Sequence, residues 1–510
     1  MRIFWSILLC ASAAFCGQWI TFGGDQERDG WARGETILTK ANVGKIKLVW
    51  KIKVDSPARE LSGLAAPIMV ENVLTAQGHK DIVLVAGSSD TLDAIDTDTG
   101  HLLWHKKFES TATPKQAPRW LCPNNLNATP VIQSGGENPR DKTVHVITSD
   151  GRLHSLNVVN AEDRKPPIQF VPPFSKTWSM NLVGGVLYTT TSQGCGGAKS
   201  GVWAMDLNDT NRPVTFFAST GGIWGRAGVA VDQAGTIFAL SGDAAFDPDT
   251  GKYGDTLAAL APKSLKLLDY YVPANFAFMN RKDLDMGSIS PVVFSYKQRE
   301  LVVAAGKEGR LFLLDAKSPG GPTHREPLYR SPVYLNADLY SAGRGFWGAF
   351  ASWEDSKGTR WLYAPAWGPV GPDALPFPIA NGPIPNGSVM AFKLEDKDGK
   401  LSLAPAWSSR DLNDPEPPVI ANGIVFALSN GESVVQATDD GRIMNSEQRL
   451  KAAPGRAVLY AFDSETGKEL YNSGEQINGI AHFSGIAVAN GRIYVTTFDS
   501  TVYSFGFDDQ

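Results

Sequence analysis

Short apolar runs separated by turn dipeptides recur along the whole chain. The runs are rich in β-branched and aromatic residues. They are interrupted by turn pairs at Asp150-Gly151, Gly184-Gly185, Asn422-Gly423, Asp440-Gly441 and Asn490-Gly491. Such punctuation is typical of β-hairpins. Helical periodicity is almost absent, so the pattern predicts an all-β protein.

One unit of this pattern recurs along the chain. Two apolar runs joined by a tight turn are followed by a third run, which ends in Asp and leads into a Thr-Gly turn. The third runs are at residues 92–96, 153–156, 202–206, 257–260, 311–315, 389–392, 458–463 and 502–505. About 490 residues shared among these units leave about 60 for each, which fits a four-stranded sheet with its loops. We therefore predict that residues 18–510 form one domain, an eight-bladed β-propeller of four-stranded antiparallel blades.

The two ends of the chain indicate how the ring closes. After the run at 502–505 the chain ends within a few residues, so the last unit lacks an outer strand. Residues 47–54 resemble such an outer strand, yet no unit precedes them. We expect this N-terminal strand to pair with the C-terminal blade and to close the ring.

The first 17 residues indicate an exported protein. A single Arg2 is followed by a short apolar run and small residues, which is typical of a secretory signal peptide with cleavage after Ala13 or Cys16. The run is too short to span a bilayer. A net charge of -5 argues against nucleic acid as a partner. We expect a periplasmic or secreted monomer without a membrane span.

Cysteine usage agrees with export. Two of the four cysteines, Cys10 and Cys16, lie in the predicted signal peptide, which leaves Cys122 and Cys195. An even pair in an oxidising compartment predicts a disulfide, and two buried free thiols are the alternative. The chain has no Cys-x-x-Cys-His sequence, so no covalently attached haem c is expected.

The best-preserved repeat resembles a known family. Residues 94–104 read Ala-x-Asp-x-x-Thr-Gly-x-x-x-Trp, and residues 461–471 repeat the pattern with Tyr in the last place. This is similar to the repeat of the pyrroloquinoline quinone (PQQ) propeller superfamily, and the resemblance covers essentially the whole mature chain. The superfamily includes quinoprotein alcohol dehydrogenases and non-catalytic scaffolds. In the dehydrogenases, PQQ and Ca²⁺ lie in the axial channel.

The resemblance assigns roles to four residues of this chain. Trp224, in Gly-Gly-Ile-Trp-Gly, matches the indole on which the quinone stacks. Asp243 stands where the family has a metal-binding Asn, and Asp285 is the candidate base or metal ligand. Lys307 matches the cation that contacts the quinone oxygens. For each residue, a purely structural role is the alternative.

Two departures leave a second function class open. The family's metal-binding Glu is replaced here by Lys199, which cannot bind Ca²⁺. The family's adjacent-cysteine pair is absent, although a Cys122–Cys195 bridge could substitute for it. The resemblance thus implies a PQQ- and Ca²⁺-dependent oxidoreductase that acts on an alcohol or sugar and uses a separate electron acceptor. The alternative is a non-catalytic propeller that binds protein or small-molecule partners.

Overall fold

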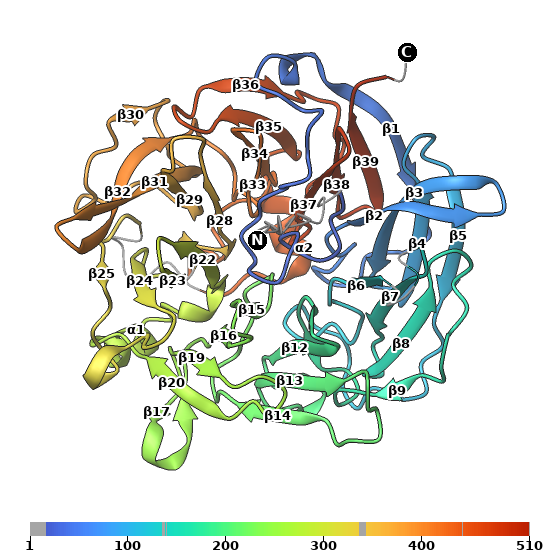
Figure 1. Cartoon of the computed structure of the whole chain (residues 1–510), viewed down its shortest axis with the longest axis horizontal. Coiled ribbons are helices and arrows are strands. Elements are labelled where there is room, and N and C mark those ends of the chain that lie inside the picture. Colours follow the sequence, from blue (N-terminus) through green and yellow to red (C-terminus); the bar gives the residue numbers. More distant parts are fainter. Residues whose placement is uncertain (1–16, 135–137, 139, 336–342, 441, 509–510) are drawn as a thin grey trace, which may run out of the picture.

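Eight β-sheets stand around a central axis in the computed structural model of the chain (Figure 1). The structure describes residues 17–134, 138, 140–335, 343–440 and 442–508. Residues 1–16 of the predicted signal peptide lie outside the described residues. Each sheet contains an antiparallel run of four strands, which confirms the predicted eight-bladed propeller.

The first four blades follow one another along the chain. Their strands are β2 (Ile68–Thr75), β3 (Gly78–Gly87), β4 (Thr91–Asp96) and β5 (Leu102–Lys107) in blade one; β6 (Val131–Ser134), β7 (Lys142–Ile147), β8 (Arg152–Asn157) and β9 (Ile168–Gln169) in blade two; β10 (Lys176–Thr177), β11 (Asn181–Val183), β12 (Val186–Ser192), β13 (Gly201–Asp206) and β14 (Thr215–Ala218) in blade three; and β15 (Ala230–Val231), β16 (Ile237–Leu240), β19 (Leu257–Leu260) and β20 (Leu267–Tyr271) in blade four.

The other four blades complete the ring. Their strands are β22 (Val292–Tyr296), β23 (Arg299–Ala305), β24 (Leu311–Asp315) and β25 (Tyr329–Arg330) in blade five; β26 (Gly345–Phe346), β28 (Ala351–Glu354), β29 (Arg360–Trp367), β30 (Ile379–Ala380), β31 (Gly387–Lys397) and β32 (Lys400–Ser408) in blade six; β33 (Val419–Ala421), β34 (Ile424–Ser429), β35 (Val458–Asp463) and β36 (Glu469–Asn472) in blade seven; and β37 (Ile486–Ala489), β38 (Arg492–Thr496), β39 (Thr501–Gly506) and β1 (Lys47–Lys53) in blade eight.

The remaining elements are short. A hairpin of β17 (Phe246–Asp247) and β18 (Lys252–Tyr253) projects from blade four, and β21 (Ile289–Ser290) pairs in parallel with β27 (Gly348–Ala349) between blades five and six. The α-helices of the described residues are α1 (Phe276–Arg281) and α2 (Ser446–Ala452). None of the helices that the structure describes is long and apolar enough to cross a membrane.

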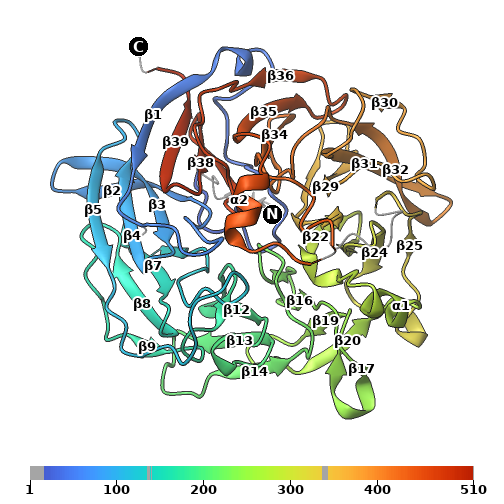
Figure 2. The ribbon, with the colours of Figure 1, turned by 180° about the vertical axis from the view of Figure 1, so that it is seen from behind.

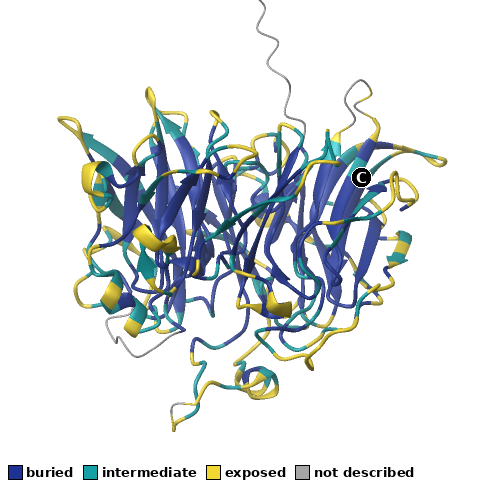
Figure 3. Ribbon diagram, turned by 90° about the horizontal axis from the view of Figure 1, so that it is seen from below, coloured by how far each residue is buried: buried dark blue, intermediate teal, exposed yellow. Residues whose placement is uncertain are grey.

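The repeated apolar runs form the inner and middle strands of the blades. All eight runs expected as third strands are third strands: β4, β8, β13, β19, β24, β31, β35 and β39. Neighbouring blades cover both faces of each sheet, so a run such as Ile82–Ala86 is buried without alternation. Figure 3 shows buried strands through the body of the disk, with exposed residues mainly in loops.

The N-terminal strand closes the ring as predicted. β1 pairs antiparallel with β39, with Lys51 opposite Tyr503. The side chain of Trp50 points to the next blade, where its indole N–H donates to the carbonyl of Thr97 at 2.7 Å. The first blade in sequence is therefore held to the last by a strand and an indole from the N-terminus.

This indole contact explains the Thr-Gly and Trp positions of the repeat. A Cβ on Gly100 would lie 2.7 Å from the Trp50 ring, and one on Gly467 would lie 2.4 Å from the Trp407 ring. The indole N–H of Trp407 in blade six donates to the carbonyl of Ser464 in blade seven, as the indole of Trp50 in blade eight does to Thr97 of blade one. An outer-strand Trp thus packs on the turn glycine of the following blade, where only glycine leaves room.

Two segments close the ends of the central channel. Residues 18–33, the N-terminal plug, cross one face near the axis (Figure 1). Carbonyls of the plug accept hydrogen bonds from innermost-strand amides of blades two, four, five, six and seven, namely Ile132, Val231, Val293, Ser352 and Ile420. Residues 430–457, the blade-seven insertion, join β34 to β35 and carry α2 across the opposite face (Figure 2).

Candidate functional site in the central channel

The four residues singled out by the sequence converge at one place in the structure. Trp224 lies before β15, Asp243 follows β16, Asp285 precedes β21, and Lys307 follows β23. The Lys307 ammonium lies 2.6 Å from the Asp285 carboxylate and 5.3 Å from the centre of the Trp224 ring. The Asp243 amide donates to Asp285 at 2.8 Å. We call Asp243, Asp283, Asp285 and Lys307 the acid–lysine cluster.

Two glycines let the backbone come close to Asp285. A Cβ on Gly242 would lie 2.2 Å from the Asp285 carboxylate, and one on Gly306 would lie 2.3 Å from the Asp285 carbonyl oxygen. The glycines of Ser-Gly-Asp and Ala-Gly-Lys are therefore steric requirements of this arrangement. They place Asp243 and Lys307 on either side of a buried Asp285.

The charges of Asp285 and Lys307 stabilise each other. Burial alone would raise the pKa of Asp285, but the Lys307 ammonium and hydrogen bonds from the neighbouring acids hold it below its ordinary value. Burial alone would lower the pKa of Lys307, but Asp285 and Asp283 raise it. Asp283 contributes a second contact to the ammonium at 3.0 Å. At neutral pH, Asp285 is a carboxylate and Lys307 an ammonium.

The other two acids hold protons more tightly than usual. Burial, together with the hydrogen bond and charge of Asp285, raises the pKa of Asp243 to about 8. Burial, opposed by Lys307, raises the pKa of Asp283 to about 6. The three carboxyl groups each offer an oxygen within 4.8 Å of the others. The cluster thus combines an ionised acceptor, a fixed cation and carboxyl oxygens suited to a hard cation.

Indole rings lie on one side of the cluster. Trp224 meets Trp347 edge to face at a centroid distance of 5.1 Å, and Trp347 stacks on Trp367 at 4.5 Å. The Lys307 ammonium lies 5.5 Å from the Trp347 ring. Val434 of the blade-seven insertion packs in the same hydrophobic group. The insertion therefore covers the aromatic side of the site.

The remaining sequence predictions have separate outcomes. Cys122 and Cys195 form the predicted disulfide, with their Cα atoms 5.3 Å apart, and it links the loop before β6 to the turn after β12. Lys199 is exposed, and its carbonyl accepts a hydrogen bond from Thr191. The structure does not bring Lys199 into the group of carboxylates, where Asp283 supplies the third acid.

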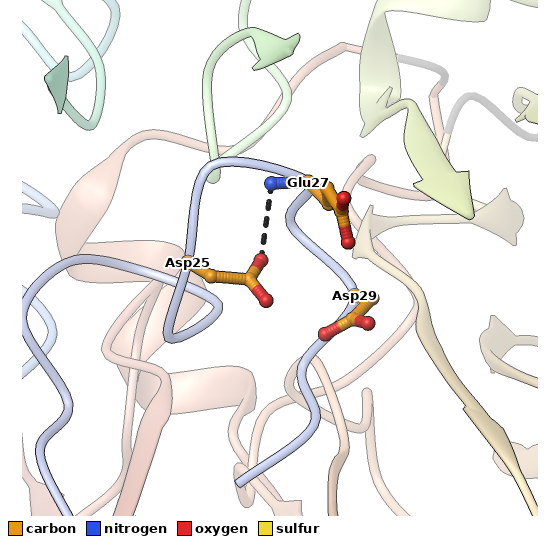
Figure 4. A group of neighbouring side chains, drawn as sticks. All are labelled: Asp25, Glu27 and Asp29. Carbon is orange, nitrogen blue, oxygen red and sulfur yellow. Dashed lines mark hydrogen bonds between the residues drawn. The ribbon is translucent and has the colours of Figure 1, made fainter. Parts of the chain in front are cut away.

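A second carboxylate group lies in the N-terminal plug (Figure 4). Asp25 accepts a hydrogen bond from the Glu27 amide at 3.0 Å, as the dashed line shows. Arg33 forms ion pairs with all three acids, Asp25, Glu27 and Asp29, which ties the two ends of this part of the plug together. We assign this group to holding the plug in its fold.

The channel also contains two buried ion pairs that the sequence did not predict as functional groups. Arg226 pairs with Glu416, and His482 contacts Glu432 at 2.6 Å. All four side chains are buried. The only signal was positional, because the segments with Arg226, Glu416 and His482 begin inner strands at the axis.

The channel holds a small cavity between the plug and the insertion. Its cavity has a volume of about 60 Å³, and Phe22, Trp178, Arg226, Arg449 and Phe483 are among its lining residues. The donor set of the acid–lysine cluster suits PQQ and a divalent cation chemically. The cavity of about 60 Å³ is lined by none of these cluster residues and is itself too small for a tricyclic quinone.

Comparisons with known proteins agree on the fold. The family model described as outer membrane protein assembly factor BamB matches residues 31–213. No curated protein sequence matches the chain. Quinohemoprotein alcohol dehydrogenase from Comamonas testosteroni has 15% identity and a TM-score of 0.59, with 97% of this chain and 81% of that one covered.

Two further solved structures have the same fold. Quinohemoprotein alcohol dehydrogenase ADHIIG from Pseudomonas putida HK5 has 12% identity and a TM-score of 0.64, covering 97% of this chain and 81% of that one. A europium-containing methanol dehydrogenase has 12% identity and a TM-score of 0.62, covering 96% and 98%. At these identities the likeness establishes the fold alone.

Proposed function

We propose that this chain, which belongs to the PQQ-repeat β-propeller superfamily, is a quinoprotein-like oxidoreductase of an alcohol or sugar hydroxyl. One observation carries the proposal: Trp224, Asp243, Asp285 and Lys307 come from four separate segments and meet at one place in the channel. A structural role for each residue taken singly would not require this convergence.

Each residue then has a role at a stated atom. The carboxyl oxygens of Asp243, Asp283 and Asp285 would hold Ca²⁺, with Asp283 acting in place of the family's Glu. The Trp224 ring would support PQQ, and the Lys307 ammonium would stabilise negative charge on its oxygens. Bound PQQ supplies the two-electron acceptor. The Asp285 carboxylate is the acceptor for the hydroxyl proton of the substrate.

Export and electron transfer complete the proposal. The signal-like residues 1–17 and the Cys122–Cys195 disulfide support a periplasmic or secreted protein. Because the chain has no haem-attachment sequence, we infer that electrons leave through a separate acceptor. The substrate is a small alcohol or sugar.

The test is a PQQ titration of the purified mature protein with and without Ca²⁺, followed by thermal unfolding. Ligand binding to the native state raises the melting temperature by mass action. We expect a Ca²⁺-dependent increase that is lost in Trp224→Ala and in Lys307→Ala. Lys297→Ala is the matched control, because Lys297 forms an exposed ion pair with Asp396 far from the cluster.

The second candidate function is a non-catalytic scaffold that binds a protein or small-molecule partner. The 60 Å³ cavity beneath the insertion and the exposed Lys199 in place of the metal-binding Glu favour it. No change of melting temperature at saturating PQQ and Ca²⁺ would support the scaffold and contradict the oxidoreductase.

A further inference from the structure

The small channel cavity has an unusual lining. The charged or titratable side chains of its described lining are all basic, namely Lys176, Arg226, Arg449 and His482. Aromatic rings supply much of the remaining wall, from Phe22, Trp120, Trp178 and Phe483. Among the residues that the structure describes, no acidic side chain belongs to the lining. At about 60 Å³ the cavity has room for only a few water molecules.

Two of the basic residues have no carboxylate partner. Within the described part of the chain, no acidic side chain lies within ion-pair distance of Lys176 or Arg449. Lys176 is only 9% exposed, and its ammonium lies 5.5 Å from the Trp178 ring centre. Arg449, on α2, is 7% exposed, and its guanidinium carbon lies 5.8 Å from the centre of the Trp120 ring. Burying a charge without a partner is costly. The side chains of Lys176 and Arg449 would therefore be stabilised by an anion bound between them and the aromatic rings.

The nearby acids do not supply that counter-ion. Glu416 pairs with Arg226, and Glu432 contacts His482. Burial and the charge of Glu432 raise the pKa of Asp414 well above its ordinary range, although the charge of Arg449 opposes them, and Asp414 is not among the residues that line the cavity. Burial, reinforced by Arg449, lowers the pKa of Lys176 to about 8. Lys176 and Arg449 therefore face the cavity without a carboxylate in ion-pair contact.

We propose that this cavity is a binding site for a small carboxylate anion. Lys176 supplies a point charge, and the planar guanidinium of Arg449 can donate two parallel hydrogen bonds to a carboxylate. The rings of Trp178, Trp120 and Phe483 favour a flat ligand over a tetrahedral one. The volume limits the ligand to a few heavy atoms, so the site is distinct from one for a quinone.

The experiment compares small ligands by calorimetry and thermal unfolding at constant ionic strength. Sodium acetate is the probe, acetamide is the neutral isostere, and inorganic phosphate is the tetrahedral anion. We expect acetate to bind and to raise the melting temperature, with weaker binding of phosphate and none of acetamide.

Substitutions locate the site. Lys176→Met is expected to weaken acetate binding at least about tenfold, because it removes a buried charge–charge contact. It is also expected to raise the melting temperature without acetate, because the uncompensated charge is gone. Arg449→Gln is the second variant with weakened binding. Lys115→Met, at an exposed lysine outside the cavity, is the matched control.

Three results would overturn the proposal: equal responses to acetate and acetamide, tighter binding of phosphate than of acetate, or unchanged acetate affinity in both Lys176→Met and Arg449→Gln. The site does not depend on the proposed oxidoreductase activity. Asp285→Asn is expected to abolish the PQQ response and to leave acetate binding intact, so failure of one proposal is distinguishable from failure of the other.

Discussion

Asp285 shows how burial and one neighbour decide the state of a carboxyl group. It is almost fully buried, yet it remains ionised because the Lys307 ammonium lies 2.6 Å away. Asp243 is more exposed, and its amide donates a hydrogen bond to Asp285. Burial, with the hydrogen bond and charge of Asp285, raises the pKa of Asp243 to about 8. Two acids with opposite shifts are what an acid–base site needs.

Asp255 offers a test of these electrostatics. It is fully buried, its carboxylate accepts a hydrogen bond from the Met286 amide, and its other oxygen has no hydrogen-bond partner. Burial, with the Asp285 charge, raises its pKa from 3.8 to about 8. The folded state therefore binds this proton more tightly than the unfolded state does, and the contribution to stability is lost as pH rises from about 4 to about 8.

We predict that Asp255→Asn removes this loss. The variant should be more stable than the parent by more than about 1 kcal/mol at pH 8 to 9, with the difference vanishing near pH 4. Denaturant unfolding across this pH range measures the difference. A constant difference at every pH would show that the charge of Asp255 is not the cause.

Neighbouring blades are joined by contacts between outer-strand tryptophans and turn glycines. Trp50, Trp104 and Trp407 each donate an indole hydrogen bond to a carbonyl of the following blade. The repeat therefore encodes the joints between sheets as well as the strands. Because Trp50 comes from the N-terminus, one such joint lies at the closure of the ring.

We predict that Trp50→Ala lowers the free energy of unfolding by about 3–5 kcal/mol, since it leaves a large cavity between blades eight and one. Chemical denaturation measures this loss. Lys51→Ala is the matched control, because Lys51 is exposed on the same strand and should change little. Equal effects of the two substitutions would mean that pairing of β1, rather than the indole, holds the ring.

At the scale of the whole molecule, segments outside the repeat determine access to the channel. The N-terminal plug fastens to the innermost strands through its backbone and through Arg28, which is fully buried and donates to the carbonyls of Met180 and Val229. The blade-seven insertion closes the other end through Val434 and Arg449. The channel is therefore an internal site rather than an open pore.

The disulfide contributes to stability at this same scale. Cys122 and Cys195 are 73 residues apart, so the bond restricts a long loop of the unfolded chain. We predict that replacing both by Ala costs about 2–4 kcal/mol of unfolding free energy. Denaturant unfolding with and without dithiothreitol measures it. The parent should lose that stability on reduction, whereas a response of the Cys-free variant to dithiothreitol would contradict the assignment.

The repeat alone determined the blades, because the signals for strands and turns are local. All eight third strands lie at the predicted apolar runs, and the pairing of β1 with β39 follows from an extra strand at the N-terminal end and a missing outer strand in the last unit. Family resemblance also identified Trp224, Asp243, Asp285 and Lys307, because each stands at a fixed offset from a strand.

Only the tertiary structure decided what these residues meet. The Arg226–Glu416 pair joins positions 190 residues apart, and no local pattern links them. The anion cavity depends on Arg449, which belongs to an insertion without repeat signal that crosses the channel. Short-range patterns fix a strand through its own turns, whereas burial, charge pairing and enclosure depend on segments brought together by ring closure. The sequence therefore determined the propeller, and its folding into a closed ring determined the electrostatics of the channel.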